Sequence, residues 1–518
     1  MTPDALTPFE NCDIRTLIDD QAARRGDHPW LVWEPFEGAG RTWTYAQFGR
    51  TVRRFAAGLQ ARGVKPGDRV LAHLDNCPEA IIVWLGCAYA GSVAVTTNAK
   101  SSADEISYFA RHSGAVGAVT QPRFAELVRD AASDLGWLAV TASDNGAPPG
   151  ADMSGFEAFA AIDADPAGLI DRPHDPMAPF AIQYTSGTTA RPKAVLWTHA
   201  NALWGAQMSA QNEDLRADDV HLITLPLFHT NAQVYSVMAA LWAGATIVVQ
   251  PKFSASRFWP VSLEHGCTWT SMVPFCLKAL MDLPVPAHRY RLWGNAICSP
   301  PTDAHFGVKT IGWWGMTETI THGIVGSTVH ANAPLSMGRP SPAYQIHVLD
   351  DEGLPVKPGQ TGDLFVGGRR GVSLFAEYAG DPAATAAAFR DDGLFITGDR
   401  ARVGEDGFLY FGDRTKDMLK IGGENVAASE IERVIAAVPG VAEVAVVGKR
   451  HPMLDEVPVA FVIPAGAGDA ALRGVILAAC DTMLASFKKP HEVRFVDSLP
   501  RSTLEKVAKA QLRAMAEG

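Results

Sequence analysis

Hydrophobic and polar positions alternate along the chain between helical and strand-like spacing. From residue 45, apolar side chains recur three or four residues apart, which predicts one face of a helix. These side chains are Tyr45, Phe48, Val52, Phe55 and Leu59. The stop RGVKPGD follows, and then the strand-like run RVLAHL. Farther along, the apolar run ATIVVQ at 245–250 is typical of a strand covered on both faces.

This alternation predicts an α/β fold with a large N-terminal domain of parallel-rich sheets flanked by helices. Near residue 412 the amino-acid composition changes, and charged residues and glycines become more frequent. After this point the pattern predicts a helix at 429–437 and strands at 444–447 and 457–463. These elements indicate a small α+β C-terminal domain.

The change in composition also predicts the domain boundaries. We predict an N-terminal domain at 1–412, a hinge at 413–416 and a C-terminal domain at 417–518. A chain of this length is too long for one ordinary core, so two domains agree with its size.

The composition indicates a globular protein that does not bind nucleic acid. Of the 518 residues 47% are hydrophobic and 19% are charged, and the net charge of −11 comes without a long basic run. The seven cysteines include no CxxC pair, which predicts free thiols in a reducing compartment. The stretch MTPDALTPFENCDIR has acidic residues and no apolar h-region, so we expect no secretory signal. The most apolar run, IIVWLGCAYAG, is shorter than the roughly 18 residues of a membrane span. We expect a cytoplasmic protein without stable membrane insertion.

The stretch YTSGTTARPKAV at 184–195 concentrates hydroxyl groups around one glycine. The hydroxyl side chains are those of Thr185, Ser186, Thr188 and Thr189. Gly187 lets backbone N–H groups turn toward a ligand, and Lys193 adds a positive charge, so the stretch suits a phosphate. A Walker A loop is excluded because Lys193 follows Pro192, so no helix opens there. On composition alone, a polar surface turn is an equal alternative.

Five further stretches carry residues suited to nucleotide and acid chemistry. They are LPLFHTNAQ with His229, GWWGMTET with Glu318, FITGDRA with Asp399, GDRTKDMLK with Arg414, and LPRSTLEKVAK with Lys506. Singly, each has a structural alternative: Asp399 could cap a turn, and His229 could be a core histidine. The six stretches in this order resemble the adenylate-forming superfamily, which comprises acyl-CoA synthetases, firefly luciferase and peptide-synthetase adenylation domains. The resemblance covers nearly the whole chain.

The resemblance implies an ATP site. In this site Trp314 stacks on adenine, Thr317 contacts the AMP phosphate, Asp399 grips the ribose hydroxyls, and Arg414 contacts ribose and phosphate. The implied nucleotide-binding residues are Thr185, Ser186, Gly187, Thr188, Thr189, Lys193, Asn295, Trp313, Trp314, Gly315, Met316, Thr317, Asp399, Arg414 and Lys506. The phosphate loop departs from the family form [YF]TSGTTGxPKGV, because two glycines are Ala190 and Ala194 here. Alanine lacks the conformational freedom of glycine.

The resemblance also assigns catalytic roles. Lys506 corresponds to the catalytic lysine, although Glu505 precedes it where the family usually has glycine. Glu318 and Thr188 are implied to hold Mg²⁺, and His229 is implied to lie beside the acid. ATP, Mg²⁺ and CoA are the implied cofactors and co-substrates.

A second half-reaction is implied for the C-terminal domain. In the family this small domain is mobile and swings about a hinge, which corresponds to Lys416. It then presents Gly422, Gly423 and Glu424 to the adenylate for the thioester step. The missing side chains of the two glycines would let backbone approach a narrow thiol arm.

Several phrases, among them SGTTARPKAV, FSASRFW and MLASFKKP, resemble the crotonobetaine/carnitine-CoA ligase-like branch. The candidate acid-pocket residues are His229, Asn231, Gln233, Val234, Trp293, Trp313, Thr321 and His322. Two tryptophans could form a cage for a quaternary ammonium, or could pack on a ring or a branched chain. No acidic residue near the motifs is expected to point inward, apart from Glu318. We expect a small to medium organic acid as substrate, with a carnitine-like acid among the candidates.

The lead hypothesis is an AMP-forming acid–CoA ligase. Two alternatives stay open: an adenylating enzyme that loads an acyl group on a carrier-protein phosphopantetheine, and a non-catalytic nucleotide-binding homologue. The retained Lys193, Glu318, Asp399 and Lys506 argue against the non-catalytic alternative. Homodimers are usual among related proteins, so a homodimer is a further expectation.

Overall fold

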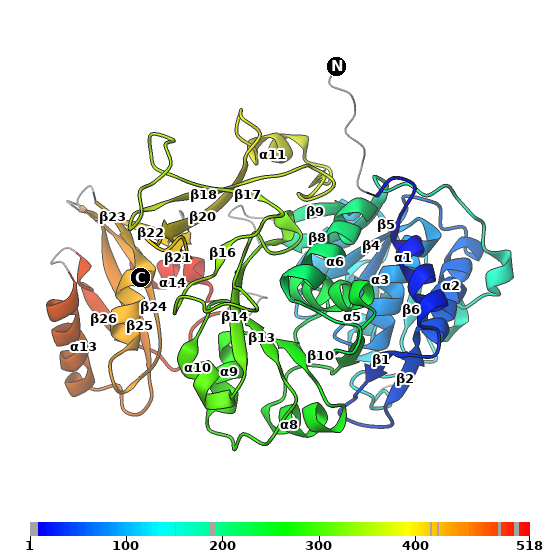
Figure 1. Ribbon diagram of the computed structural model, residues 1–518, viewed down its shortest axis with the longest axis horizontal. Helices are drawn as coiled ribbons and strands as arrows, with labels where there is room; N and C mark the ends of the chain where they lie inside the picture. Colours follow the sequence, from blue (N-terminus) through cyan, green and yellow to red (C-terminus); the bar gives the residue numbers. More distant parts are fainter. Residues whose placement is uncertain are drawn as a thin grey trace. The chain divides into compact units, whose positions relative to one another are not determined.

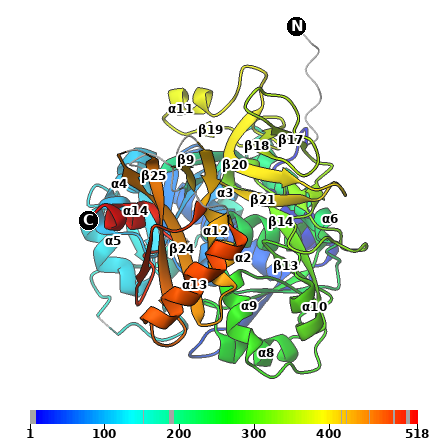
Figure 2. The same ribbon diagram turned by 90° about the vertical axis from the view of Figure 1, so that its left-hand side faces the viewer.

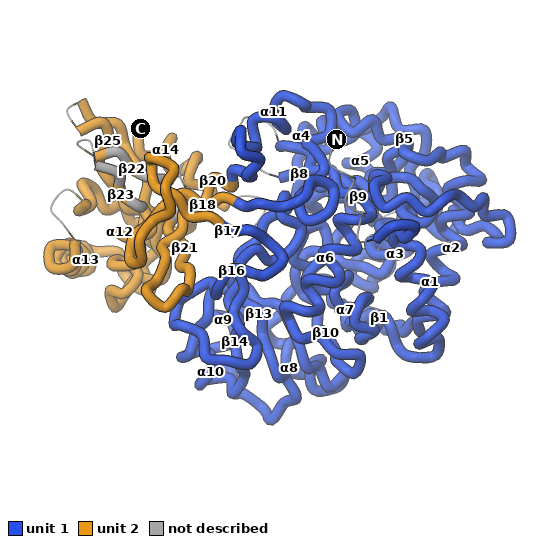
Figure 3. The backbone as a smooth tube through the Cα atoms, turned by 45° about the horizontal axis from the view of Figure 1, so that its top comes forward, with its two compact units in different colours: residues 1–346, 366–396 blue, residues 347–365, 397–518 orange. Residues whose placement is uncertain are grey.

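The chain forms two compact units, shown in two colours in Figure 3. The computed structural model describes residues 9–150, 152–185, 192–414, 417–421, 424–452, 454–484, 488–501 and 507–518. Unit 1 comprises residues 1–346 and 366–396, and unit 2 comprises 347–365 and 397–518. The predicted boundary at 412 therefore lies inside unit 2, and the division falls earlier in the chain. The reason is that strands from before residue 412 join a sheet of unit 2.

A nine-stranded sheet forms one half of unit 1, in the order β16-β15-β14-β13-β12-β10-β11-β1-β2. Its strands are β1 (Pro29–Trp33), β2 (Arg41–Thr44), β10 (Val220–Ile223), β11 (Thr246–Val249), β12 (Trp269–Ser271), β13 (Leu292–Asn295), β14 (Lys309–Trp314), β15 (Ile324–Val325) and β16 (Arg339–Pro340). From β14 to β1 all pairs are parallel, and only the edge strands run antiparallel.

An eight-stranded sheet forms the other half, in the order β19-β9-β8-β4-β3-β5-β6-β7. Its strands are β3 (Arg69–His73), β4 (Val93–Thr97), β5 (Ala115–Thr120), β6 (Leu138–Val140), β7 (Glu157–Ala158), β8 (Pro179–Thr185), β9 (Lys193–Thr198) and β19 (Glu377–Tyr378). The pairs from β8 to β7 are parallel, whereas β9 returns antiparallel to β8 and receives β19. Both sheets are therefore parallel-rich, as predicted.

Helices flank both sheets (Figure 1). The helices of unit 1 are α1 (Ile14–Arg24), α2 (Tyr45–Ala61), α3 (Pro78–Ala90), α4 (Ala103–Ser113), α5 (Ala125–Ala131), α6 (His199–Asn212), the π-helix η4 (Asn231–Met238), α7 (Ala239–Ala243), α8 (Ala255–Glu264), α9 (Pro274–Met281), α10 (Pro300–Phe306) and α11 (Pro382–Ala387), with the short 3₁₀ turns η1 (Pro122–Phe124), η2 (Phe159–Ile162), η3 (Pro166–Gly168) and η5 (Thr317–Thr319). Helices α8, α9 and α10 pack on one face of the nine-stranded sheet, and α4 and α5 pack on the eight-stranded sheet.

Unit 2 contains two smaller sheets. The first has the order β17-β18-β20-β21, and the second has the order β23-β22-β25-β24 with β26 paired to β25. Their strands are β17 (Gln345–Leu349), β18 (Thr361–Gly367), β20 (Phe395–Val403), β21 (Leu409–Arg414), β22 (Met418–Ile421), β23 (Glu424–Ala427), β24 (Val441–His451), β25 (Asp455–Pro464) and β26 (Glu492–Phe495). Helices α12 (Ala428–Ala436) and α13 (Ala470–Met483) pack on one face of the second sheet, and α14 (Lys509–Glu517) packs on the other (Figure 2).

The periodic patterns of the sequence correspond to real elements. The five apolar positions of the first predicted helix are all buried along α2. The run at 245–250 forms β11, whose four residues are buried between the parallel neighbours β1 and β10. The α/β architecture with a large sheet-rich part and a smaller C-terminal part is thus confirmed. Among the described helices, none is long and apolar enough to cross a membrane.

Candidate active site

The two ends of the predicted phosphate loop are neighbours in unit 1. Thr185 ends β8 and Lys193 begins β9, and these two residues pair directly across the antiparallel ladder. The residues between them, 186–191, lie outside the described part of the chain, so the predicted roles of Ser186, Gly187, Thr188 and Thr189 stay predictions. The ladder nevertheless holds both ends of the loop at one place.

Lys193 and Glu318 meet at the same third side chain, Tyr378. The Lys193 ammonium lies over the Tyr378 ring, 4.6 Å from its centre. The Tyr378 hydroxyl donates a hydrogen bond of 2.9 Å to Glu318 Oε1. Both Tyr378 and Glu318 are buried, and burial raises the pKa of Tyr378, so the phenol stays a neutral donor. A positive loop residue and a carboxylate are therefore held at one aromatic side chain.

Tyr378 was not among the predicted site residues. It lies on the two-residue strand β19, opposite Val195 of β9. Its own N–H donates to the Thr385 hydroxyl at 2.9 Å, and its ring packs 4.7 Å from that of Phe375. Its stretch of sequence, SLFAEYAGDPAATAAAF, also resembles the crotonobetaine/carnitine-CoA ligase-like branch, but it gives no sign of a contact with Lys193 or Glu318.

A buried polar network holds Thr317. The Thr230 hydroxyl lies 3.2 Å from the Thr317 hydroxyl and 2.9 Å from Gln183 Oε1. The Gln183 amide in turn donates to Gln233, whose own amide lies 3.4 Å from the Thr96 hydroxyl. Gln233, a predicted acid-pocket residue, therefore belongs to the hydrogen-bond network that holds Thr317, the predicted phosphate contact. The indole of Trp197 also donates to the Thr317 carbonyl at 2.9 Å.

The remaining predicted nucleotide residues of unit 1 lie at the ends of β13 and β14. Trp313 and Trp314 are consecutive residues of β14 and so face opposite sides of the sheet. Asn295 pairs with Gly312 and accepts a hydrogen bond from the N–H of Ala296. Two further predicted residues follow the strand, Gly315 and Met316.

The turn after β14 is tightly packed. A side chain at Gly315 would meet the Tyr235 hydroxyl and the Thr321 carbonyl, so only glycine fits there. The N–H of Met316 donates to the Thr319 hydroxyl at 3.0 Å. The predicted adenine motif therefore borders the π-helix η4 through Tyr235.

Three aromatic rings come together beside this turn. The His322 ring lies 4.8 Å from that of Trp313, nearly parallel to it, and 4.0 Å from that of Tyr235, and the Trp313 and Tyr235 rings meet edge to face at 5.6 Å. The hydroxyl groups of Thr321 and of Ser209 in α6 share a hydrogen bond of 2.6 Å. The structure therefore brings three of the predicted acid-pocket residues together, Trp313, Thr321 and His322, and adds Tyr235.

The other predicted acid-pocket residues line the start of η4. Val234 is buried against Gly205 of α6. His229 and Asn231 are half-buried, and the His229 ring lies 4.4 Å from that of Phe228. A π-helix often occurs at a functional site, which fits the predicted pocket residues on η4.

Trp293 does not belong to this group. It packs in the core under α8 and α10, near Phe258 at 5.8 Å and Phe306 at 4.9 Å. The ring of Trp313 instead covers Gly294, the next residue of β13, on the opposite face. Trp293 and Gly294 are neighbours on β13 and so face opposite sides of the sheet. Because Trp313 lies on the Gly294 side, the prediction of a cage containing both Trp293 and Trp313 is wrong.

A second inward acidic residue contradicts another prediction. Glu213, which follows α6, is fully buried, and its Oε1 lies 3.6 Å from Nε2 of His322. Glu318 is thus not the only carboxylate directed inward near the motifs. The sequence QNEDLR around Glu213 has the appearance of an exposed helix end and carries no signal for burial.

In unit 2 the predicted ribose contacts are neighbours. Asp399 on β20 pairs directly with Arg414 on β21. Asp399 is buried, and its N–H donates to the Thr397 hydroxyl at 3.1 Å.

The remaining predicted residues of unit 2 stay predictions. Lys416, Gly422, Gly423 and Lys506 lie outside the described part of the chain, as does the side chain of Glu424.

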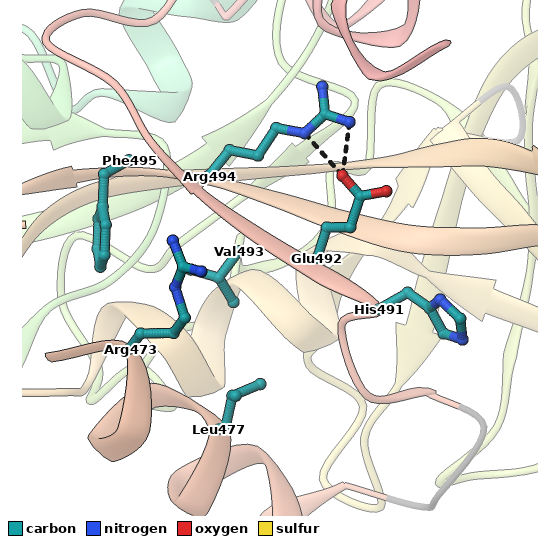
Figure 4. A pocket seen from close by; sticks show the side chains of 7 residues that line it. All are labelled: Arg473, Leu477, His491, Glu492, Val493, Arg494 and Phe495. Atoms are coloured by element: carbon teal, nitrogen blue, oxygen red, sulfur yellow. Dashed lines mark hydrogen bonds and ion pairs between the residues drawn. The ribbon is translucent and has the colours of Figure 1, made fainter. Parts of the chain in front are cut away.

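Unit 2 also has a surface depression of about 500 Å³ along α13 and β26 (Figure 4). Arg494 at its edge donates to Glu492 Oε2 through Nε at 2.8 Å and Nη2 at 2.5 Å. Arg473 lies over the Phe495 ring, 5.6 Å from its centre. None of the predicted site residues lines this depression.

Comparisons with known proteins agree with these motifs. A family model described as AMP-binding enzyme matches residues 18–378, and one described as AMP-binding enzyme C-terminal domain matches residues 430–506. Crotonobetaine/carnitine–CoA ligase of Salmonella paratyphi C is 33% identical over 97% of this chain and 99% of its own length. The enzyme of that name from Escherichia coli O7:K1 is 33% identical over 96% and 98%.

Solved structures are similar along the whole chain. ATP-bound MatB from Rhodopseudomonas palustris has a TM-score of 0.84 and 29% identity, covering 97% of this chain and 99% of that one. O-succinylbenzoate coenzyme A synthetase from Bacillus subtilis, in complex with AMP, has a TM-score of 0.83 and 26% identity, covering 97% and 98%.

Proposed function

The chain belongs to the family of AMP-binding enzymes, and from this membership we propose that it is an AMP-forming acid–CoA ligase. It activates a carboxylic acid with ATP to an acyl-adenylate and pyrophosphate. It then transfers the acyl group to CoA as a thioester and releases AMP. The observation that carries the proposal is the meeting of Lys193, Tyr378 and Glu318 at the ends of the phosphate loop.

The reaction of a carboxylate with ATP explains why such a site needs both positive and negative groups. A carboxylate is a poor electrophile, because its leaving group would be oxide. Attack on the α-phosphate of ATP brings two anions together, and positive groups must stabilise the charge that spreads over the transferring group. Lys193 supplies one such charge, and Lys506 supplies a second to the carboxylate and the α-phosphate. The network beneath Thr317 holds that hydroxyl in one position for the AMP phosphate.

Glu318 and Thr188 are the proposed Mg²⁺ ligands. A carboxylate and a hydroxyl are hard oxygen donors, which Mg²⁺ prefers. The buried Glu318 carboxylate fits this role, because Tyr378 orients it with a hydrogen bond at one oxygen. When bound, Mg²⁺ supplies charge neutralisation at the phosphates.

The thioester step is proposed for unit 2. Gly422, Gly423 and Glu424 would line the approach of CoA after rotation about Lys416. In hinge motions of this kind a few residues absorb a large change in φ and ψ. The adenylation residue Lys506 would then leave the acid.

The proposed substrate is a small to medium organic acid. The names of the two similar ligases make a carnitine-like acid the first candidate. A cytoplasmic location and a homodimer remain parts of the same proposal.

The first experiment is acid-dependent pyrophosphate release from ATP and Mg²⁺ over a panel of carboxylic acids, with and without CoA. The panel should include carnitine-like, short branched, alicyclic and aryl acids. We expect one class of acid to support release, and CoA to be required for turnover with AMP formation. Lys506→Ala should abolish acid-dependent release.

Three outcomes would contradict parts of the proposal. AMP formation that needs an acyl-carrier protein instead of CoA would favour the carrier-loading enzyme. ATP binding without release for any acid would favour a non-catalytic homologue. Unchanged release by Lys506→Ala would overturn the role of that lysine.

A further inference from the structure

A carboxyl group without a hydrogen bond lies in the interior of unit 1. Glu213 follows α6 and has no exposed surface. Neither of its side-chain oxygens has a hydrogen-bond partner among the described residues. Its backbone carbonyl is held by the Trp269 indole at 3.0 Å, so the position of the residue is well defined.

The charged groups nearby are engaged elsewhere. Arg291 binds Asp219 Oδ1 through Nε at 2.9 Å and Asp214 Oδ2 through Nη1 at 3.2 Å. The nearest basic group is Nε2 of His322, at 3.6 Å from Glu213 Oε1, and this nitrogen also has no hydrogen-bond partner in the described chain. The titratable groups around Glu213 are therefore His322, Tyr235 and Arg291.

Burial disfavours the charged form of both members of the Glu213–His322 pair. Burial raises the pKa of Glu213 well above its usual range. Burial also lowers the pKa of His322 to about 3. Burying polar groups without hydrogen bonds costs free energy, so a buried carboxyl group without one calls for an explanation.

The pair lies beside two aromatic rings, those of Trp313 and Tyr235. The His322 ring packs against both Trp313 and Tyr235, whose own rings meet edge to face at 5.6 Å, and its Nε2 points toward Glu213. Trp313 and Tyr235 keep 8% and 5% of their surface exposed, whereas Glu213 and His322 keep none. The Tyr235 hydroxyl lies against Gly315 of the predicted adenine motif. The hidden carboxyl group therefore lies beside His322, a residue of the predicted acid pocket that stacks on Trp313.

We propose that Glu213 is the specificity-determining residue of the acid pocket and that it selects an acid carrying a cationic group at the end remote from its carboxylate. This inference rests on the proposed function. Aromatic faces attract cations through their quadrupole, and a carboxylate beside them adds a counter-charge that water does not screen. An alkylated ammonium needs no hydrogen bond, so charge and ring faces are sufficient to recognise it.

The proposal implies that a proton is released on binding. The arriving cation stabilises the ionised form of Glu213, so the proton leaves the carboxyl group for the solvent. A neutral acid of the same shape gives no such stabilisation and leaves Glu213 protonated. Binding of a cationic acid should therefore release about one proton, and binding of its neutral isostere should release none.

The test compares two acids of the same shape, 4-(trimethylammonio)butanoate and 5,5-dimethylhexanoate, in which carbon replaces the ammonium nitrogen. We would measure kcat/KM for acid-dependent pyrophosphate release by the full chain, by Glu213→Gln and by the control Glu126→Gln, which changes an exposed glutamate. We expect the natural chain to favour the cationic acid at least tenfold. Glu213→Gln should reduce this ratio at least tenfold, and Glu126→Gln should keep it.

A second measurement needs no variant. Calorimetry of acid binding, with the α,β-methylene analogue of ATP present, in two buffers of different ionisation enthalpy gives the protons released. About one proton for the cationic acid and none for the isostere would support the proposal. Equal proton release for both acids would overturn it.

The kinetic outcomes separate this inference from the proposed function. A ratio that Glu213→Gln leaves unchanged would make Glu213 a structural residue. Preference for the isostere, or no turnover of either acid, would refute cation recognition. If other acids of the panel are still converted with CoA, only this inference fails. The absence of pyrophosphate release with every acid would overturn the proposed function itself.

Discussion

At the scale of single residues, Tyr378 is the side chain on which the candidate site depends most. Its hydroxyl orients Glu318, and its ring carries the Lys193 ammonium. A charged amine over an aromatic ring gains about 0.5–2 kcal/mol, depending on desolvation. A hydrogen bond to a charged group contributes about 1.5–3 kcal/mol. One side chain thus positions two groups of opposite charge without neutralising either.

Replacing Tyr378 with Phe should separate these two contributions. Tyr378→Phe removes the hydrogen bond to Glu318 and keeps the ring beneath Lys193. If Glu318 holds Mg²⁺, we expect the Mg²⁺ concentration for half-maximal pyrophosphate release to rise roughly tenfold, since about 1.4 kcal/mol of orientation is lost. The KM for the acid should change little.

Tyr378→Leu is the matched variant, because it also removes the ring. We expect it to raise the KM for ATP in addition, through the loss of support for Lys193. A Mg²⁺ dependence that is the same in the natural chain and in Tyr378→Phe would show that this hydrogen bond does not orient a metal ligand.

At the scale of elements, β13 and β14 determine which side chains can share a pocket. Trp313 of β14 covers Gly294 of β13, where a methyl group would overlap its ring. Trp293 points to the other face and fills the core under α8 and α10. The Trp313 indole can therefore approach the backbone of β13 closely only because Gly294 has no side chain.

Gly294→Ala should displace Trp313. The added methyl group must push the indole aside, and overpacking of this kind typically costs about 1–3 kcal/mol of stability. We expect a lower melting temperature and a several-fold rise in the KM for the acid, with a smaller effect on the KM for ATP. Steady-state kinetics and thermal unfolding measure these changes.

The control is Gly168→Ala, since a methyl group there meets no other described atom within 4 Å. It should leave both constants and the melting temperature nearly unchanged. Equal effects of Gly294→Ala on the KM for the acid and for ATP would speak against a place for Trp313 in the acid pocket.

At the scale of the whole molecule, unit 1 buries several histidines in the neutral form. Burial lowers the pKa of His199, His221 and His322 to about 3 each. In the unfolded chain a histidine takes up a proton near pH 6.5. Between these two values the unfolded state binds more protons, so the free energy of unfolding falls as the pH falls below about 6.5.

We therefore expect the melting temperature to drop between pH 7.5 and pH 5.0. Each buried histidine should contribute a loss on the order of 1–2 kcal/mol at pH 5. His221→Gln should show a shallower drop, because one of the proton-binding groups is missing. The exposed His330 provides the control: His330→Gln should keep the slope of the natural chain. Parallel slopes for all three proteins would contradict this account.

The proposed rotation of residues 417–518 about Lys416 also belongs to this scale. Lys416→Pro fixes the backbone at the predicted hinge, because the proline ring locks φ near −65°. We expect pyrophosphate release in the adenylation step to stay within about twofold, and thioester formation to fall at least tenfold. Separate assays of the two half-reactions measure this, and an equal loss in both would remove Lys416 from the hinge.

Local order in the sequence was sufficient for the elements and for the family. The spacing of the apolar positions in α2 and the uninterrupted run of β11 predicted a helix and a doubly covered strand, because side-chain direction repeats with a fixed period within an element. Six motifs in order indicated the nucleotide chemistry, since the residues of each motif are neighbours along the chain.

Contacts between distant residues were decided only by the tertiary structure. Nothing in the sequence relates Tyr378 to Lys193 and Glu318, because β19 returns to pair with β9 after almost two hundred residues. The pairing of β13 with β14 separated Trp293 from Trp313, and the packing of α6 buried Glu213 beside His322. Hydrophobic periodicity specifies the face of an element, whereas the partner of that face depends on how the chain is threaded through the sheets.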